Sequence, residues 1–487
     1  MERQTSQLLR SATRLLHVWS ISHVWLILVV TAALSVYMLW LTTSDNQLET
    51  VDLTETHFGT PLPTLTRTGR RHRFHRSVDA PTPRRHTSLY YNRRDLPQDF
   101  QQWASAAERT CSGRLIGYGQ EFALLKNVVV DKAYCRCRRL GGEPISDVFN
   151  QDESEEYYTI DVGCYQLPCA EFRPCSFNGN NQLNSWITSL KTGRDVVSSD
   201  AYQFDEFTIA VQRYEYVNLY HTMTDWYNAF LVMQFFGRAP SQTNILIFDS
   251  HPYGSLDPVW PQLFNSTFRL SALPSRTRFR RLVWSIIGYN SPMKIFISPY
   301  PPLLDEFRSF FLSSFDISAD RQVDCRNMSV LFLWRRDYIA HPRNPTGFVV
   351  RKIANEARLI DYVRATMSDE LGAVRGVQID ALSMHDQLRL IVDADILVGV
   401  HGAGLTHAIF LPRGAGLLEL SPNVLWASNE HFEAIASWRR LTFLRWTNYD
   451  VALENESQGT VTFPPKVITA SIRKIRRQMC SVTTSVS

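Results

Sequence analysis

Short runs of almost wholly apolar residues recur from residue 207 onward, and they constrain the fold of this chain more than any other feature. Strands buried on both faces of a parallel sheet have this composition, whereas strands with one wet face alternate apolar and polar residues. Stretches with helical periodicity separate the runs, and such alternation predicts an α/β architecture. The strands are expected at 207–211, 244–248, 329–334, 394–400 and 416–420, and the helices at 222–236, 353–367 and 384–392.

The length of 487 residues allows roughly two to four domains. Apolar residues make up 44% and charged residues 20%, so most of the chain can build a packed core. We expect two α/β halves with a cleft between them. The first would span 96–320 with a cysteine-rich start, and the second would span 321–487.

The N-terminal region predicts a membrane anchor. Val24–Leu41 contains no charged residue and is long enough for a spanning helix, which needs about 17–25 residues. Arginines precede it and acidic residues follow it, so the tail at 1–23 is expected to stay cytoplasmic and the bulk of the chain to be lumenal. A cleaved signal peptide is the alternative, but its apolar stretch is usually shorter and ends in small residues. Residues 42–95 are rich in arginine and proline and predict a disordered basic stem.

Cysteines and sequons fit the same topology. Most of the eight cysteines fall between residues 111 and 175, which indicates disulfides in an oxidising compartment without revealing their pairing. A zinc site is disfavoured because Cys135 and Cys137 are separated by a single residue and no matching pair follows. N-glycosylation sequons stand at Asn265, Asn327 and Asn455. A net charge of +4 does not favour a nucleic-acid partner. This plan is that of a single-pass type II protein of the Golgi membrane.

The run Val398–Pro412 is the strongest local signal. A buried strand enters the small-residue loop His401–Gly404 and then a helix that we expect to start near Leu405. Small residues let a backbone approach a ligand closely, and the free N–H groups of a helix start favour an anion. Parallel sheets bind ligands outside the carboxyl ends of their strands. The loop therefore predicts a diphosphate site, to which His401 can donate; a structural turn with a buried histidine is the alternative.

Charged residues follow two of the expected strands. Arg335, Arg336 and Asp337 come after the strand at 329–334, where a planar guanidinium can bind two oxygens of a diphosphate. An ion pair with Asp337 is the alternative. Glu419 lies near the end of the strand that follows the loop, where an acidic residue can bind ribose hydroxyls.

The stretch Glu215–Tyr227 is dense in polar and aromatic side chains. His221 and Asp225 are four residues apart, so a helix places them on one face. A carboxylate or an imidazole within reach can take the proton that a sugar hydroxyl loses as it attacks. The alternative is an ordinary capped helix start with Trp226 buried.

Together these segments resemble glycosyltransferase family 61. Tyr214–Tyr227 looks like its acceptor-half motif and Val330–Arg343 like its arginine motif. Leu382–Arg389 followed by Gly399–His407 looks like its donor-site signature, which His431–Trp438 continues. The resemblance covers about residues 205–445 and is strongest to the branch that adds xylose to the core of plant-type N-glycans.

This resemblance implies a GT-B-like fold of two Rossmann-like halves and an inverting transfer of xylose from UDP-xylose to the core β-mannose of N-glycans, in β-1,2 linkage. No obligatory cofactor or metal is expected. His221 or Asp225 would be the base, and Glu215, Asn218 and Trp226 would lie on the acceptor side. The donor would be held by Arg335, His401, Gly402, Ala403, Gly404, Leu405, Thr406 and Glu419. One departure is that Trp334 takes the place of the first arginine of the family motif, which favours Arg335 over Arg336.

Other functions remain open at this point. A protein O-linked N-acetylglucosamine transferase of the same family would use UDP-N-acetylglucosamine, although such enzymes are typically soluble and carry a C-terminal retrieval signal, which Val482–Ser487 is not. A xylan-modifying transferase would share the topology. A lectin-like membrane protein that kept the fold without activity is the non-enzymatic alternative.

Overall fold

The computed structural model describes residues 97–170, 182–193, 200–294, 300–319, 321–423 and 429–483. The expected cytoplasmic tail, membrane anchor and basic stem all lie outside these residues. Within the described residues, no helix is both long enough and apolar enough to cross a membrane.

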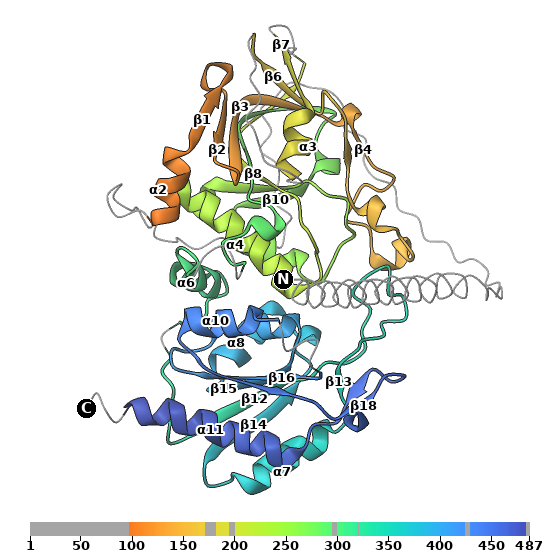
Figure 1. Cartoon of the computed structure of the whole chain (residues 1–487). Helices are drawn as coiled ribbons and strands as arrows, with labels where there is room; N and C mark the ends of the chain where they lie inside the picture. Colours follow the sequence, from red (N-terminus) through yellow and green to blue (C-terminus); the bar gives the residue numbers. More distant parts are fainter. Residues whose placement is uncertain are drawn as a thin grey trace, which may run out of the picture. The chain divides into compact units, whose positions relative to one another are not determined.

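Two sheets organise the described residues (Figure 1). In the first, the strands β11, β8, β9 and β10 run parallel in that order, and an antiparallel meander of β1, β2 and β3 extends it beside β11. Numbered along the chain, the parallel strands have the order 3-2-1-4, which is the order that begins dinucleotide-binding sheets. The strands of this sheet are β1 (Ala107–Thr110), β2 (Leu115–Tyr118), β3 (Phe122–Asp131), β6 (Tyr165–Pro168), β7 (Leu190–Gly193), β8 (Tyr202–Val211), β9 (Thr243–Ile247), β10 (Ser266–Arg269) and β11 (Arg276–Trp284).

Helix α4 leads from β8 into β9 and is buried over most of its length. Asn218 caps its start, because the side-chain oxygen accepts the N–H of Tyr220 at 3.0 Å. The helix is apolar nearly all round, as expected for one enclosed by other elements. The helices of this part are α2 (Gln98–Ser105), α3 (Gln182–Thr188), α4 (Leu219–Phe235), α5 (Trp260–Leu263) and α6 (Leu304–Ser314).

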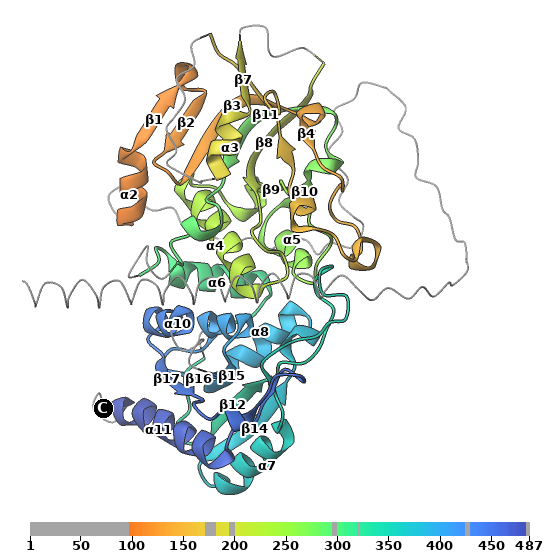
Figure 2. The same cartoon turned by 45° about the vertical axis from the view of Figure 1, so that its right-hand side comes forward.

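The second sheet is parallel throughout, with the order β14-β12-β15-β16-β17. This is the doubly wound order 2-1-3-4-5, in which the strand order reverses between β12 and β15. Helices α7 and α11 cover one face, and α8 and α10 cover the other (Figure 2). The elements are β12 (Met328–Leu333), α7 (Glu356–Thr366), β14 (Leu371–Val377), α8 (Met384–Val392), β15 (Ile396–Val400), β16 (Gly416–Ser421), α10 (His431–Arg439), β17 (Thr442–Thr447) and α11 (Pro465–Thr483).

Short strands complete the fold. β4 (Cys135–Arg136) pairs with β5 (Thr159–Ile160), and β13 (Lys352–Ile353), β19 (Thr460–Val461) and β18 (Glu454–Asn455) form a small sheet. The mixed α/β architecture is therefore confirmed, and each strand expected from an apolar run is present with slightly shifted ends. β11 ends and β12 begins on either side of the boundary predicted near residue 320.

One helix differs from the expectation. The segment after the small-residue loop is a 3₁₀ helix, η11 (Ala403–Phe410), rather than an α-helix starting near Leu405. The N–H of Leu405 bonds the carbonyl of Gly402, three residues earlier, at 2.9 Å. This tighter winding suits a short connection between two adjacent parallel strands.

Three disulfides join the described cysteines: Cys111 with Cys169, Cys135 with Cys164, and Cys325 with Cys480. The third ties the approach to β12 to the last helix across 155 residues of sequence. Closing so long a loop stabilises the fold by ~5 kcal/mol in the chain-entropy account. Cys137 keeps a free thiol, and Cys175 lies outside the described residues.

Candidate active site

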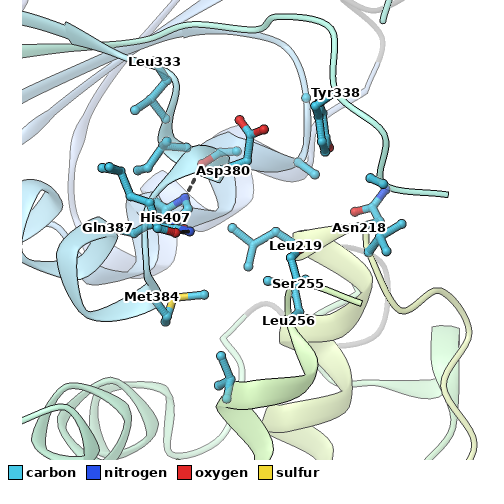
Figure 3. A pocket seen from close by; sticks show the side chains of 18 of the residues that line it. Asn218, Leu219, Ser255, Leu256, Leu333, Tyr338, Asp380, Met384, Gln387 and His407 are labelled. Carbon is cyan, nitrogen blue, oxygen red and sulfur yellow. Dashed lines mark hydrogen bonds between the residues drawn. The ribbon is translucent and has the colours of Figure 1, made fainter. Parts of the chain in front are cut away.

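A cavity of about 780 Å³ opens at the carboxyl ends of β12 and β15, where the order of the second sheet reverses. This is the position at which doubly wound sheets bind ligands, and the volume suits a nucleotide-sized molecule. Its lining comes from segments within 215–219, 255–262 and 314–316 on one side, and within 333–351, 379–387 and 400–407 on the other. Figure 3 shows Leu219, Ser255 and Leu256 facing Met384, Gln387 and His407.

Two arginines form a positive wall of the cavity. Arg335 follows β12 and donates its Nε–H to the carbonyl of Val350 at 2.8 Å. Arg351 donates from its guanidinium to the carbonyl of His401 at 2.7 Å. Burial and the neighbouring charge of Arg335 lower the pKa of Arg351 to about 10. Two cations held this close together favour a multiply charged anion between them.

Arg351 lines the cavity but could not be recognised as a site residue from the sequence. Its backbone φ is +65°, a conformation that few residues other than glycine adopt and that tends to occur at functional sites. It lies sixteen positions after Arg335 in a stretch with no strand or helix pattern, so spacing carried no signal. The two guanidinium groups come together only because the segment after β12 folds back, so that Arg351 bonds the carbonyl of His401 in the loop after β15.

The small-residue loop borders the same wall. Gly402, Ala403, Gly404 and Leu405 line the cavity. A Cβ on Gly402 would lie 2.7 Å from a guanidinium nitrogen of Arg335, so glycine leaves room for that side chain. Thr406 is fully buried.

His401 and Glu419 lie behind the loop. Both are buried, and His401 Nδ1 is 2.5 Å from one oxygen of Glu419. The other oxygen of Glu419 accepts from Arg445 Nε at 3.0 Å. Neither residue is part of the cavity lining formed by the described residues. The geometry makes Glu419 a partner of His401 and Arg445, and its expected contact with ribose stays a prediction.

The residues beside Arg335 have other partners. Arg336 pairs with Glu356 at 2.5 Å, and Asp337 pairs with Lys352 at 2.7 Å. Asp337 is therefore engaged away from Arg335, and the interpretation of Arg335 as one half of a local ion pair does not hold.

The structure separates the predicted residues near helix α4. Glu215 and Asn218 line the cavity, whereas His221, Asp225 and Trp226 are not among its described lining residues. Trp226 packs against Trp260 and Phe311 in the core.

Burial shifts the pKa of both His221 and Asp225. Burial, with a smaller effect of His431, lowers the pKa of His221 to about 4, so the imidazole is neutral at pH 7. Asp225 is almost fully buried, and this burial raises its carboxyl pKa well above the usual value although Arg213 opposes it. Asp225 is also absent from the described cavity lining, so it could reach an acceptor hydroxyl only after a rearrangement.

Other predicted sites are placed as follows. The sequon residues Asn265, Asn327 and Asn455 are all exposed. Within the part of the chain that the structure describes, no cluster of three or more histidine, cysteine or acidic side chains is arranged to hold a metal ion.

Comparison with known proteins agrees with this geometry. Residues 219–418 match the family model described as glycosyltransferase 61. The chain is 27% identical to β-1,2-xylosyltransferase RCN11 of Oryza sativa subsp. japonica over 342 residues, which cover 62% of this chain and 63% of the rice protein. It is 25% identical to β-1,2-xylosyltransferase of Arabidopsis thaliana over 409 residues, covering 67% and 76%. An EGF domain-specific O-linked N-acetylglucosamine transferase of Gallus gallus is 25% identical over 300 residues, covering 56% and 50%.

The described residues thus combine a doubly wound sheet, a cationic, nucleotide-sized cavity at its switch point and a segment that matches the glycosyltransferase 61 model. Glycosyltransferase 61 is therefore the family that residues 219–418 resemble, and β-1,2-xylosyltransferases are among the proteins to which the chain is similar. The match spans less than two thirds of the rice relative, so the activity, substrates and partners of the whole protein are treated below as proposals.

Proposed function

We propose that this protein transfers xylose from UDP-xylose to the core β-mannose of N-glycans, in a β-1,2 linkage with inversion. The observation that carries the proposal is the pair Arg335 and Arg351 beside the loop Gly402–Leu405, at the carboxyl ends of β12 and β15. The choice of xylose is supported by the similarity to the rice and Arabidopsis β-1,2-xylosyltransferases.

The proposed fold class is GT-B-like. The first sheet contains the strand order 3-2-1-4 and the second the order 2-1-3-4-5, so both contain a parallel nucleotide-binding core. UDP would lie against the second sheet, and the glycan would enter from the side formed by 215–219 and 255–262.

Charge stabilisation is the main task on the donor side. As the bond from the sugar to the diphosphate breaks, negative charge grows on the leaving oxygen. Arg335 and Arg351 are placed to neutralise it, with the N–H groups at the start of η11 close by. Two guanidinium groups can do what a divalent cation does in other transferases, so we propose that no metal is obligatory.

Inversion requires a single in-line displacement, in which a base removes the proton of the attacking hydroxyl. The segment from Glu215 to Asp225, which opens helix α4, is the source of this base. The expected setting is a Golgi membrane, with the catalytic part lumenal and anchored by Val24–Leu41. The three described disulfides and the exposed sequons support a lumenal setting.

A second candidate is transfer of N-acetylglucosamine to protein. It is favoured by the similarity to EGF domain-specific O-linked N-acetylglucosamine transferases of several animals, which are 25–28% identical over shorter stretches. A non-catalytic lectin-like role is disfavoured by the intact positive wall of the cavity.

The test is a donor screen. Purified protein is incubated with an N-glycan acceptor, or with a folded EGF-like domain, and with UDP-xylose or UDP-N-acetylglucosamine in separate tubes, each with and without EDTA. We expect a pentose mass increase on the glycan that survives EDTA. An N-acetylhexosamine added to the EGF-like domain would instead establish the second candidate.

The ribose of UDP is expected to contact Asp380. This residue follows β14, the second strand of the sheet, where an acidic residue binds ribose hydroxyls in dinucleotide folds. It lines the cavity near Tyr338 and Arg335 (Figure 3). Hydrogen bonds to charged groups contribute about 1.5–3 kcal/mol, so calorimetry should show UDP binding at least ~10-fold tighter than 2′-deoxy-UDP. Asp380→Asn should bind both nucleotides alike, whereas Asp369→Asn, before the other end of β14, should keep the preference.

A further inference from the structure

Glu215 is the ionisable side chain of the 215–225 segment that reaches the cavity. It precedes helix α4, and its side chain is 22% exposed. Val217 donates its N–H to one oxygen of Glu215 at 3.3 Å, which leaves the second oxygen turned toward His341 at 3.9 Å. Neither His221 nor Asp225 belongs to the described lining.

The other lining carboxylates lie elsewhere in the cavity. Asp380 lies on the donor side, near Arg335 and Tyr338. Asp316 follows helix α6. Glu215 comes from the segment before helix α4, whereas Arg335 follows β12 of the second sheet, so the two lining groups belong to different elements.

His341 has a defined orientation beside Glu215. Its Nδ1 accepts the backbone N–H of Arg343 at 3.1 Å, so in the neutral ring Nε2 carries the proton. Burial and Arg343 lower the pKa of His341 although Glu215 and Glu156 oppose them, which keeps the ring neutral at pH 7. Nε2 lies 3.4 Å from Glu156 and 3.9 Å from Glu215 without a hydrogen bond to either, so two carboxylates lie beside this N–H.

Glu156 lies beside His341 and is buried. It is 2% exposed, and its second oxygen faces His251 at 3.4 Å and Arg343 at 3.0 Å. Burial raises the pKa of Glu156, but His251, Arg343 and His341 outweigh burial and hold the pKa below its usual value. A buried negative charge therefore anchors the imidazole that contacts Glu215.

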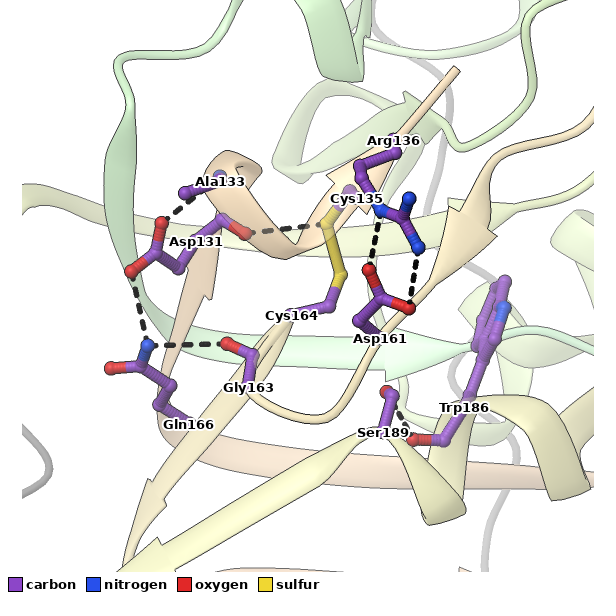
Figure 4. Close-up of a disulfide and its surroundings, with 10 residues drawn as sticks. All are labelled: Asp131, Ala133, Cys135, Arg136, Asp161, Gly163, Cys164, Gln166, Trp186 and Ser189. Carbon is purple, nitrogen blue, oxygen red and sulfur yellow. Dashed lines mark hydrogen bonds and ion pairs between the residues drawn. A yellow bond between two sulfur atoms is a disulfide. The ribbon is translucent and has the colours of Figure 1, made fainter.

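The segment that carries Glu156 lies outside the matched family domain. It ends the 3₁₀ helix η5 (Glu153–Glu156), between β4 and β5. The Cys135–Cys164 disulfide fastens this region, and Arg136 pairs with Asp161 beside it at 2.6 Å (Figure 4). The cysteine-rich start of the chain thus supplies a buried group to the active site.

We propose that Glu215 accepts the proton of the attacking sugar hydroxyl, and that Glu156 acts as a positioning residue through His341. The inference rests on the proposed function, since it names the base for that transfer. The hydroxyl O–H bond breaks and its proton passes to Glu215. The hydroxyl oxygen bonds to C1 of the donor sugar as the C1–O bond to the diphosphate breaks, and the electron pair leaves on UDP beside Arg335 and Arg351.

The decisive variant is Glu215→Gln, which keeps the shape of the side chain and removes its basicity. Loss of a general base typically lowers the rate by about 10²–10⁴-fold, so we expect kcat to fall by that factor. The Kd of UDP, measured by calorimetry, should stay within about twofold. Glu153→Gln, an exposed acid on the same 3₁₀ helix as Glu156, should keep wild-type values of both.

Glu156→Gln tests the positioning role through the pH profile. Without the buried charge, the His341 N–H points to Glu215 alone and favours its ionised form. The acid limb of kcat/KM should then move to lower pH, and kcat should fall while UDP binding is kept. The charge of Glu215 also acts on the phenols of Tyr157, Tyr216 and Tyr338, and the variant leaves these three side chains in place.

The outcomes separate the two proposals. A wild-type protein that transfers no sugar from any UDP donor overturns both. An active wild type with at least half its kcat retained in Glu215→Gln overturns the inference alone, as does loss of transfer in Asp225→Asn but not in Glu215→Gln. If Glu156→Gln does not fold, as judged by UDP binding and circular dichroism, the result with Glu215→Gln still decides the identity of the base.

Discussion

Replacing Arg335 by alanine is expected to weaken UDP binding by roughly 10–100-fold. Hydrogen bonds from a guanidinium to a phosphate contribute about 1.5–3 kcal/mol, and 1.4 kcal/mol corresponds to a tenfold change. Arg335 is largely buried against the carbonyl of Val350, so its orientation toward the cavity is set before the ligand arrives. Isothermal titration calorimetry with UDP measures the effect directly, without any requirement for turnover.

The neighbouring Arg336 provides the matched control for Arg335. Arg336 also lines the cavity, but its guanidinium is paired with Glu356 at 2.5 Å and is half exposed. Arg336→Ala should therefore change the Kd of UDP by less than about threefold, whereas equal losses in the two variants would contradict the assignment of Arg335.

Arg351→Ala should weaken UDP binding by a similar factor. Because the two guanidinium groups repel each other and would share one ligand, the double variant should lose less than the sum of the two single losses. If the loss of binding free energy in the double variant equals the sum of the two single losses, the two arginines bind separate groups.

The second large effect concerns stability. Arg213→Ala is expected to lower the free energy of unfolding by about 3–5 kcal/mol, because it removes the closest partner of two buried carboxylates and leaves them only the longer contacts of Arg269. Arg213 is 1% exposed and contacts Asp249 at 2.7 Å and Asp257 at 2.8 Å. Burial alone would lower the pKa of Arg213, but Asp249 and Asp257 raise it above its ordinary value. Urea unfolding followed by circular dichroism measures the loss.

The large loss of unfolding free energy expected for Arg213→Ala results from the burial of the ion pairs and not from their short distances. Arg136 and Asp161 lie 2.6 Å apart, yet both are well exposed, so Arg136→Ala should have a far smaller effect. Equal destabilisation in the two variants would contradict the role of the buried cluster. Since Arg213 lies two positions before Glu215, partial unfolding here would also disturb the cavity wall.

Local patterns were sufficient for the architecture. Continuous apolar runs predicted β8, β9, β12, β15 and β16, because a strand covered on both faces has no polar side to present, whereas β10, β11, β14 and β17 were not predicted. The loop Gly402–Leu405 was recognisable for a similar reason: small residues between a buried strand and a helix have few other uses. Asn218 and Glu215, which were expected on the acceptor side, line the cavity.

Roles that depend on neighbours distant in sequence were not accessible in this way. The pairing of Glu419 with His401 and with Arg445 of the adjacent strand could not be predicted, and its expected contact with the ribose stays a prediction. Asp225 shares a helix with His221, yet burial raises its pKa and removes it from the lining. Arg351 and Glu156 carry no local signal at all.

The sequence by itself determined the class of fold, five of the parallel strands and the small-residue loop that lines the cavity, because hydrophobic periodicity and small-residue loops act over a few residues. The tertiary structure decided which charged side chains are buried, which are paired and which reach the cavity. Those properties depend on the dielectric surroundings and on partners brought together from strands and loops far apart in the chain, such as Glu156 with His341 and Arg335 with Arg351.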